Sequence, residues 1–341
     1  MTTTARPTLA TIADSAGVSV ATVSKVLNGR SDVAEETRAR VQRVLAAHRY
    51  TATPRRRPGM PRAVELLVDH LRSPFTSEVV QGVADAAAEA GVDVTLSTRA
   101  SGGDHEPTDA EWARRLARTG RCGLISVAGE LTREQLRALS DAPVPVVLVD
   151  PIDPQASTTP SIGSTNFTGG LSAGQHLIAL GHTSIGYVGG ALRAACNAAR
   201  VGGLRAAMEQ HGLALDPALV TAGQVFDYET GLQGGLQLLD RAEPPTAVFC
   251  GADEVALGVL EAARRVGLRV PQDLSVVGFD DTPSAATSSP PLSTVRQPLE
   301  EMGKVALRTV LRLADGGTVD APHVALATRL VVRASTARRE G

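Results

Sequence analysis

The chain has 341 residues, of which 43% are hydrophobic, and its formal net charge is −2. This length is too great for one core, so we expect two or three folding units with well-buried interiors. No apolar run reaches 18 residues and no secretory segment opens the chain, which argues against a membrane or exported protein and predicts a cytoplasmic one.

Cysteine and histidine usage argues against disulfides and metal sites. Cys122, Cys196 and Cys250 are odd in number, far apart and outside any CxxC pair, as expected of free thiols in a reducing compartment. The seven histidines show no metal-ligand spacing; His176 and His182 are six residues apart. We therefore expect no metal and no other cofactor.

Residues 8–50 predict three short helices. Thr8 and Ser19 can cap the first two, Gly17 can form the tight turn between them, and a third begins near Glu35. This is the helix-turn-helix arrangement, whose second helix reads the major groove of DNA. The predicted buried stripes are Leu9, Ile12, Ala13 and Ala16; then Val23, Val26 and Leu27; then Val41, Val44 and Leu45.

Charge is divided unevenly along the chain. Residues 1–62 contain 11 basic and four acidic residues, a net charge of +7, whereas the remainder contains 23 basic and 32 acidic residues, a net charge of −9. A basic face attracts phosphates and releases counterions on binding. The near-neutral total therefore conceals a basic head on an acidic body, which argues against a helical bundle without a DNA partner.

Residues 51–62, TATPRRRPGMPR, form the predicted linker. Its three prolines and one glycine rule out a long helix in free solution.

The body alternates strand and helix patterns, which predicts parallel sheets covered on both faces. The alternation occurs in two series, so we expect two Rossmann-like subdomains. The strands of the first series are Val64–Val68, Val92–Leu96, Leu124–Val127 and Val146–Val149; those of the second are Ile185–Val188, Ala247–Cys250 and Leu274–Phe279.

The segment GVSVATVSKVLNG is very similar to the recognition-helix signature of the lactose-repressor (LacI/GalR) family of bacterial transcription regulators, and the similarity continues through VAEETRARVQ and the body. The sequence of the body, for example residues 149–170, resembles that of actinobacterial members of the family. The resemblance implies an α/β fold: a three-helix DNA-binding head on a periplasmic-binding-protein-like core. It also implies base contacts by Val20, Ala21 and Lys25. Residues implied to hold phosphates are Thr8, Ser19, Thr22, Asn28 and Thr37.

Three departures from the family pattern concern the head and linker. Lys25 stands where arginine is usual, and a point charge selects guanine less sharply than a planar fork. Ala34 replaces the usual serine cap of the third helix, at a cost of about 1 kcal/mol. The linker lacks the leucine that enters the minor groove. We hypothesise that Arg55, Arg56 and Arg57 enter or line that groove; the alternative is a basic tether that only gathers phosphates.

In the resembling family the chain crosses between subdomains three times, and we expect crossings near Gly163, Leu292 and Pro322. The helix 299–313 then returns to the first subdomain and the last strands to the second. The expected domains are a head, 1–50; a linker, 51–62; an N-terminal subdomain, 63–163 and 293–322; and a C-terminal subdomain, 164–292 and 323–341.

A ligand cleft is expected where the carboxyl ends of the two sheets face each other. By similarity, Arg200 and Asp280 would grip the hydroxyls of a mono- or disaccharide, Asp150 would assist, and Phe226 and Phe75 would stack on the sugar ring. Asp253 and Gln297 complete the expected ligand-binding set, although Asp253 is as well placed to cap a helix. Ala252 departs from the usual asparagine, which removes one polar contact.

The leading interpretation is a homodimeric transcription regulator, most simply a repressor of sugar-utilisation genes, with operator DNA and a small sugar as partners. The alternatives are a sugar-acting enzyme or a sugar-binding protein on the same scaffold. Neighbouring strand-end residues such as Asp280 and Asp281 point to opposite sides, which is poor geometry for shared acid-base chemistry. The run Gly186–Gly190 lacks phosphate-loop spacing and predicts a tight strand exit.

Overall fold

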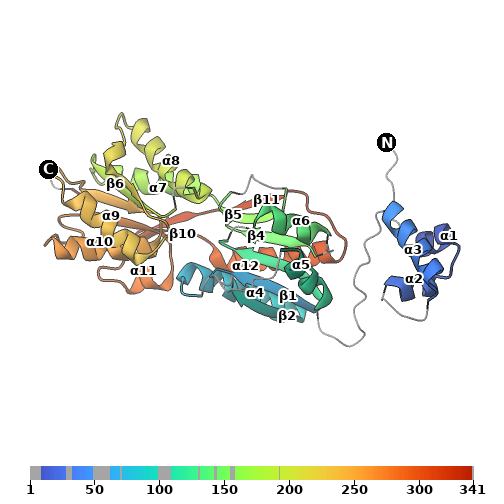
Figure 1. The fold of residues 1–341 in the computed structure, drawn as a ribbon. Helices are drawn as coiled ribbons and strands as arrows, with labels where there is room; N and C mark the ends of the chain where they lie inside the picture. Colours follow the sequence, from blue (N-terminus) through green and yellow to red (C-terminus); the bar gives the residue numbers. More distant parts are fainter. Residues whose placement is uncertain are drawn as a thin grey trace. The chain divides into compact units, whose positions relative to one another are not determined.

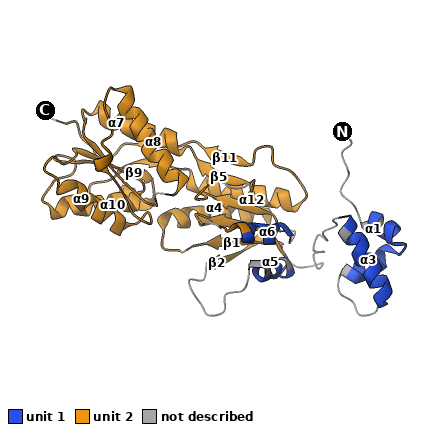
Figure 2. Cartoon of the chain, turned by 45° about the horizontal axis from the view of Figure 1, so that its top comes forward, with its two compact units in different colours: residues 1–60, 107–120, 134–144 blue, residues 61–106, 121–133, 145–341 orange. Residues whose placement is uncertain are grey.

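The computed structural model describes residues 9–27, 33–48, 62–69, 71–98, 109–129, 131–141, 144–153, 158–191 and 193–339. The chain divides into two compact units, coloured separately in Figure 2. One comprises residues 1–60, 107–120 and 134–144, and the other residues 61–106, 121–133 and 145–341. Within the described residues, no helix is long and apolar enough to cross a membrane.

The head contains the three predicted helices: α1 (Leu9–Ala16), α2 (Val20–Leu27) and α3 (Glu35–Ala47). Gly17 has a φ of 63°, so the turn between α1 and α2 uses the left-handed conformation that glycine permits. The helices α5 (Asp109–Arg118) and α6 (Arg133–Asp141) belong to the same unit. The described apolar side chains at the centre of the head are buried as predicted: Ile12, Ala13, Ala16, Val23, Val26 and Val41.

The second unit is built on two six-stranded sheets (Figure 1). Sheet A has the order β11-β5-β4-β3-β1-β2, and sheet B has the order β12-β10-β9-β8-β6-β7. Every pairing is parallel except that of β12 with β10. The strands of sheet A are β1 (Arg62–Val68), β2 (Val92–Thr98), β3 (Arg121–Val127), β4 (Val146–Val149), β5 (Ser161–Ser164) and β11 (His323–Leu326). Those of sheet B are β6 (Ile185–Gly189), β7 (Val220–Ala222), β8 (Ala247–Cys250), β9 (Ser275–Asp280), β10 (Ser293–Arg296) and β12 (Arg329–Val331).

Helices bury the apolar faces of both sheets, because a parallel sheet needs cover that its crossover connections supply. On sheet A, α4 (Pro74–Ala90) and α12 (Leu299–Ala314) pack over Val64, Leu66 and Ile125. On sheet B, α7 (Asn166–Ala179) and α8 (Ala195–Gln210) cover one face, and α9 (Tyr228–Leu239) and α10 (Asp253–Arg265) cover the other. A short helix, α11, spans Pro283–Thr287.

The crossings between the sheets correct two predicted positions. The first follows Ser164 at the end of β5, as expected, but β10 still pairs with β9, with Ser293 opposite Val277. The second crossing therefore follows Arg296 rather than Leu292. Likewise β11 pairs with β5 in sheet A, so the third crossing follows Leu326 rather than residue 322. Each sheet accepts one more strand at an open edge before the chain leaves it.

Candidate functional site

Helix α2 presents a small polar face to solvent. Ser19 caps it: its Oγ accepts from the backbone N–H of Thr22 at 3.1 Å and shares a second hydrogen bond, 2.9 Å, with the Thr22 hydroxyl. Val20 is 43% exposed, and Ala21 and Lys25 are also exposed. A helix held by its buried side and capped by serine can thus offer its first turn and a half to a groove.

The remaining residues expected to contact DNA are placed less completely. Thr37 lies half-buried on α3. Ala34, just before α3, is exposed, and its carbonyl accepts the N–H of Arg38 at 2.9 Å without a side-chain cap. The other five expected contacts lie outside the described residues: Thr8, Asn28, Arg55, Arg56 and Arg57.

A cluster of charged side chains lies at the carboxyl ends of the strands in the second unit. Asp150 follows β4, Asp280 ends β9, and Arg200 projects from α8. Arg200 is 3% exposed and Asp280 is 6% exposed. The φ angles of Asp150 and Asp280 are 47° and 114°. Such backbone strain in non-glycine residues tends to gather at functional sites.

The Arg200 guanidinium is fixed from several directions. Its Nε donates to Asn166 Oδ1 at 2.8 Å, and its Nη1 donates to the carbonyl of Gly251. Its Cζ lies 3.9 Å from the ring centroid of Phe279 and 5.5 Å from that of Phe226. Cation–π contact and two hydrogen bonds together give the side chain one orientation.

Burial dominates the electrostatics of the carboxylates. It raises the pKa of Asp280 well above its usual value, while Arg200 opposes this shift. Burial likewise raises the pKa of Asp150, again against the influence of Arg200. The Asp280 Oδ1 accepts from Gln297 Nε2 at 2.6 Å. Burial thus disfavours the charged forms of Asp150 and Asp280, and the positive charge of Arg200 favours them.

Asp253 is one sequence-predicted ligand residue that the structure commits to internal hydrogen bonds. Its side chain is fully buried. Its Oδ2 accepts from the N–H and hydroxyl of Thr282, at 2.7 and 3.0 Å, and its Oδ1 accepts from the Thr294 hydroxyl at 2.6 Å. Burial raises its pKa to about 6. These contacts join α10 to β10 and to the loop after β9.

Gln297 is also occupied on both sides of its amide. Its Nε2 donates to Asp280, and its Oε1 accepts from the Ser164 hydroxyl. Gln297 is 3% exposed. The side chain therefore joins the ends of β5 and β9 across two of the crossings, a role that spacing along the sequence did not reveal.

The two aromatic residues differ in their surroundings. Phe226 is half-buried, and its ring occupies the space that a side chain at Gly190 would fill. Gly189 similarly leaves room for Asn197, which accepts a 2.8 Å hydrogen bond from the Tyr187 hydroxyl. Gly189, which ends β6, and Gly190, which follows it, thus allow close packing at the strand exit. Phe75, at the start of α4, packs against the core of sheet A.

Two residues of the cluster were not predicted. Asn166 begins α7 and orients Arg200. Cys196 lies near Asp150, Arg200 and Asp280, and burial raises the pKa of its thiol to about 12. An asparagine opening the helix after a crossing was the available signal for the first; nothing in the sequence marks the second.

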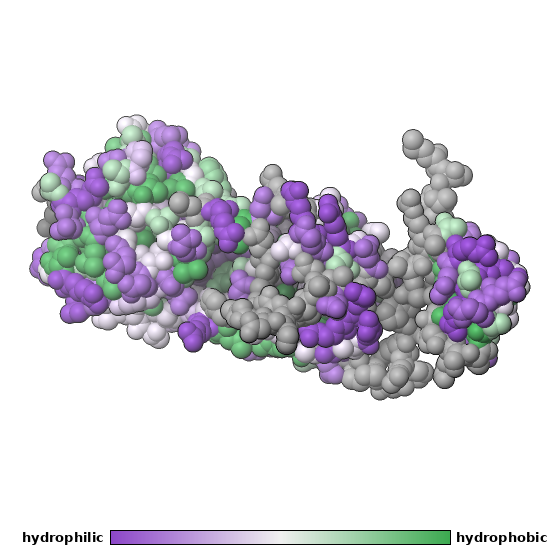
Figure 3. All heavy atoms as spheres, in the orientation of Figure 1, coloured by the Kyte–Doolittle hydropathy of each residue, from purple (hydrophilic) through white to green (hydrophobic). Residues whose placement is uncertain are grey.

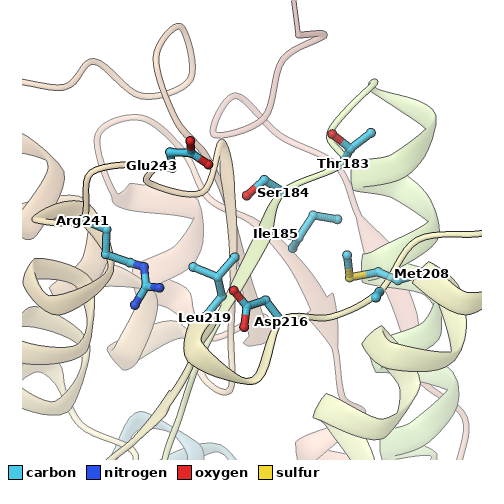
Figure 4. A pocket seen from close by; sticks show the side chains of 9 residues that line it. Thr183, Ser184, Ile185, Met208, Asp216, Leu219, Arg241 and Glu243 are labelled. Carbon is cyan, nitrogen blue, oxygen red and sulfur yellow. The ribbon is translucent and has the colours of Figure 1, made fainter.

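A separate surface pocket lies at the other end of sheet B, beside the start of β6 (Figure 4). Its volume is about 240 Å³. It contains none of the predicted site residues and stands apart from the strand ends that carry Asp280. Its lining is Thr183, Ser184, Ile185, Met208, Ala214, Asp216, Leu219, Arg241 and Glu243.

Comparison with known proteins decides the family. Residues 8–53 match the model for bacterial regulatory proteins of the lacI family, and residues 175–336 match that of a periplasmic binding protein-like domain. The transcriptional regulator MalR of Streptomyces coelicolor is 38% identical over 98% of this chain and 97% of its own length. The chain belongs to the LacI family. It is a DNA-binding regulator with an effector-binding core, and LacI-family regulators are not enzymes, so the enzyme alternative falls.

Two solved structures resemble the whole chain. The complex of the transcriptional regulator CelR with cellobiose has 32% identity and a TM-score of 0.72, and covers 97% of this chain and 100% of that one. The lac repressor dimer bound to operator and the anti-inducer ONPF has 27% identity and a TM-score of 0.71, and covers 97% and 99%. Both support the same fold for this LacI-family chain: a helix-turn-helix head and a periplasmic-binding-protein-like core with two sheets.

Proposed function

We propose that this LacI-family regulator is a homodimeric repressor of sugar-utilisation genes. Its effector is a mono- or disaccharide bound at the carboxyl ends of the two sheets, and the ligand controls how the head engages operator DNA. The similar CelR structure is a cellobiose complex, and the similar lac repressor structure is a dimer on its operator.

The observation that carries the sugar class is the composition of the cluster. Sugars combine neighbouring hydroxyls with apolar C–H faces, which suit carboxylates, guanidinium forks and aromatic rings. With Nε and Nη1 held by the protein, Arg200 offers its remaining N–H groups in one direction. Gln297 fixes Asp280 through Oδ1, so Oδ2 is the oxygen we assign to a ligand hydroxyl. Phe226 supplies the ring.

We expect a dimer because one DNA-binding head contacts only a few base pairs. A single short helix contacts too few base pairs for specificity, and helix-turn-helix proteins pair over two half-sites. Apolar patches interrupt the polar surface on the drawn face of the sheet B subdomain (Figure 3). Val225 and Tyr228, close together in the sequence, are 52% and 44% exposed. In the proposed dimer, contact between copies is assigned to a contiguous apolar patch, because single exposed apolar residues are ordinary on a protein surface.

Control by the sugar requires unequal binding. A ligand shifts a conformational equilibrium only by the difference in its affinity for the two states. In a two-subdomain core, the expected states differ in closure around the ligand, which changes where the two linkers of a dimer begin.

The sugar part is tested by a thermal-shift screen of mono- and disaccharides, cellobiose included. A sugar present at about 100 times its Kd stabilises the folded state by about 2.7 kcal/mol. We expect one sugar to raise the Tm of the natural chain and of Arg205→Ala, an exposed change on the same helix. Arg200→Ala and Asp280→Asn should lose that shift. A shift that survives in both variants would place the ligand elsewhere.

The DNA part is tested by selecting duplexes from a random pool with the full-length protein. We expect a two-half-site sequence whose affinity falls when Ser19→Ala removes the cap of α2 and when Lys25→Ala removes the cation. Binding without preference over random competitor at physiological salt would contradict the proposal, whatever the sugar screen shows.

A further inference from the structure

Helix α12 begins beside the proposed effector site. Gln297 and Pro298 immediately precede it, and Gln297 holds Asp280 twice: its backbone N–H donates to the Asp280 carbonyl at 3.1 Å, and its side chain donates to Oδ1 at 2.6 Å. The Ser164 hydroxyl fixes the other side of the amide. A change in the position of Asp280 therefore acts directly on the residues that start α12.

The same helix ends beside the point where the linker joins the core. Asp315 follows α12 and receives two hydrogen bonds from Arg62, from Nη2 at 2.8 Å and from Nη1 at 3.2 Å. Arg62 is the first residue of β1 and the last of the linker segment 51–62. A bidentate pair fixes direction as well as distance, so the end of α12 orients the start of the linker.

Between these ends α12 is closely packed along its length, which disfavours local bending of the helix. Met302, Ala306 and Val310 are fully buried. Gly303 crosses Gly82 of α4 so closely that a Cβ at Gly303 would meet the carbonyl of Val79. Close-packed interiors transmit displacement instead of absorbing it. This packing therefore favours movement of α12 as one rigid body.

We propose that α12 transmits effector occupancy from the cleft to the linker, with Gln297 and the Arg62–Asp315 pair as positioning residues at its two ends. The inference rests on the proposed function, because it takes Asp280 as a ligand contact. A sugar hydroxyl on Asp280 Oδ2 changes the carboxylate that Gln297 holds. The change passes along α12 and alters how Asp315 holds Arg62, where the chain leaves for the DNA-binding head.

The chain's own thiols provide the readout. Cys122 is half-buried and lies close enough to Arg62 to contribute to the raised pKa of that guanidinium. Cys196, also half-buried, lies among Asp150, Arg200 and Asp280. Cys250 is fully buried. Rates of alkylation by iodoacetamide, measured for each cysteine by peptide mass spectrometry, thus follow both ends of α12 with an internal control for unfolding.

The experiment uses the full-length protein without sugar or DNA. Gln297→Leu is expected to change the Cys122 rate about threefold or more, a coupling at the lower end of those carried by packed networks. If α12 couples its two ends, Asp315→Ala should in turn change the Cys196 rate by about threefold or more. Arg62→Asp combined with Asp315→Arg restores the ion pair and should return Cys196 toward its natural rate. Arg308→Ala, whose side chain is 59% exposed on α12, should change neither.

The proposal is overturned if Asp315→Ala leaves the alkylation rate of Cys196 unchanged and Gln297→Leu leaves that of Cys122 unchanged. If Gln297→Leu accelerates Cys250 as well, that variant has loosened the unit, and the exposed Asp315→Ala change decides alone. Because neither ligand nor DNA is present, a negative result here leaves sugar and operator binding standing. Failure of those two assays would instead remove the proposed function itself.

Discussion

Lys25 presents a point charge on the exposed side of α2, where it can approach a base edge or a phosphate. The two kinds of contact predict different effects of substituting Lys25. An arginine in this position can bind guanine O6 and N7 together, and a good bidentate pair discriminates by about 1–3 kcal/mol. A phosphate contact carries no such preference.

We therefore expect Lys25→Arg to raise the preference for guanine at one position of each half-site by about 1 kcal/mol, roughly fivefold. Competition binding against single-base operator variants measures it. Lys25→Ala, the control, should weaken every duplex and reduce the slope of log K against log salt by about one per head. Unchanged base preference in Lys25→Arg would assign the side chain to phosphate.

His182 is a buried imidazole that secures the end of the chain. Its Nε2 lies 2.9 Å from the Ser275 hydroxyl and 3.2 Å from the Ala337 carbonyl, and its Nδ1 lies 3.0 Å from the Thr246 hydroxyl. Burial lowers its pKa. The unfolded chain therefore takes up this proton first as the pH falls, and stability is lost from about pH 6.5 downward through the folded pKa.

His182→Gln should accordingly be less stable than the natural chain at pH 7.5, with a deficit that narrows at pH 5.5. Urea unfolding at the two pH values measures both differences. His211→Gln, at an exposed position, is the matched control variant. A deficit for His182→Gln that is equal at both pH values would show that the imidazole does not titrate in this range.

At the scale of elements, three pairs of helices pack against each other in the same way: α4 with α12, α7 with α8, and α9 with α10. Gly82 and Gly303, Gly170 and Gly203, and Gly231 and Gly258 each meet so that a Cβ on either glycine would strike a backbone carbonyl of the partner helix. The carbonyl belongs each time to the residue three before the partner glycine: Glu300 and Val79, Arg200 and Phe167, Val255 and Tyr228. The same crossing therefore sets the backbone of Arg200.

Neighbouring glycines on α8 test this crossing. Gly203→Ala would place a Cβ against the Phe167 carbonyl, and the forced separation of α7 and α8 should cost about 1–3 kcal/mol. Gly202→Ala would place its Cβ 3.7 Å from the Phe167 ring, an ordinary contact, and should gain up to about 1 kcal/mol of helix propensity. Urea unfolding of both variants gives the comparison; equal effects would mean that α7 and α8 separate freely.

Periodicity along the sequence predicted most elements because burial on both faces leaves near-continuous apolar strands. The crossings, which were placed by resemblance to the family, were wrong at two positions, since Ser293–Arg296 and His323–Leu326 are strands of four residues whose sheet depends on which edge is open. The resemblance to the family selected Arg200 and Asp280, which the structure buries in one cluster. It could not separate ligand contacts from supports such as Asp253 and Gln297, because that distinction depends on which oxygens neighbouring donors already occupy.

At the scale of the whole molecule, charge separation predicts a strong dependence on salt. The first 62 residues carry +7 and the remainder −9, so attraction to DNA is confined to the head and linker. Each neutralised phosphate contributes about 0.9 to the slope of log K against log salt. Three of the 11 basic residues of this region are adjacent in the linker: Arg55, Arg56 and Arg57.

These arginines distinguish a linker that reads shape from one that only adds charge. Narrow A·T minor grooves concentrate negative potential and attract inserted arginines. If the three side chains enter the groove between half-sites, replacing all three with alanine should weaken operators with an A·T centre more than those with a G·C centre. The natural preference between the two centres should largely disappear. Fluorescence anisotropy with paired operators, at matched salt, measures the ratio. An equal loss on both centres, with the salt slope reduced by the lost charges, would establish a tether that gathers phosphates without reading the sequence between the heads.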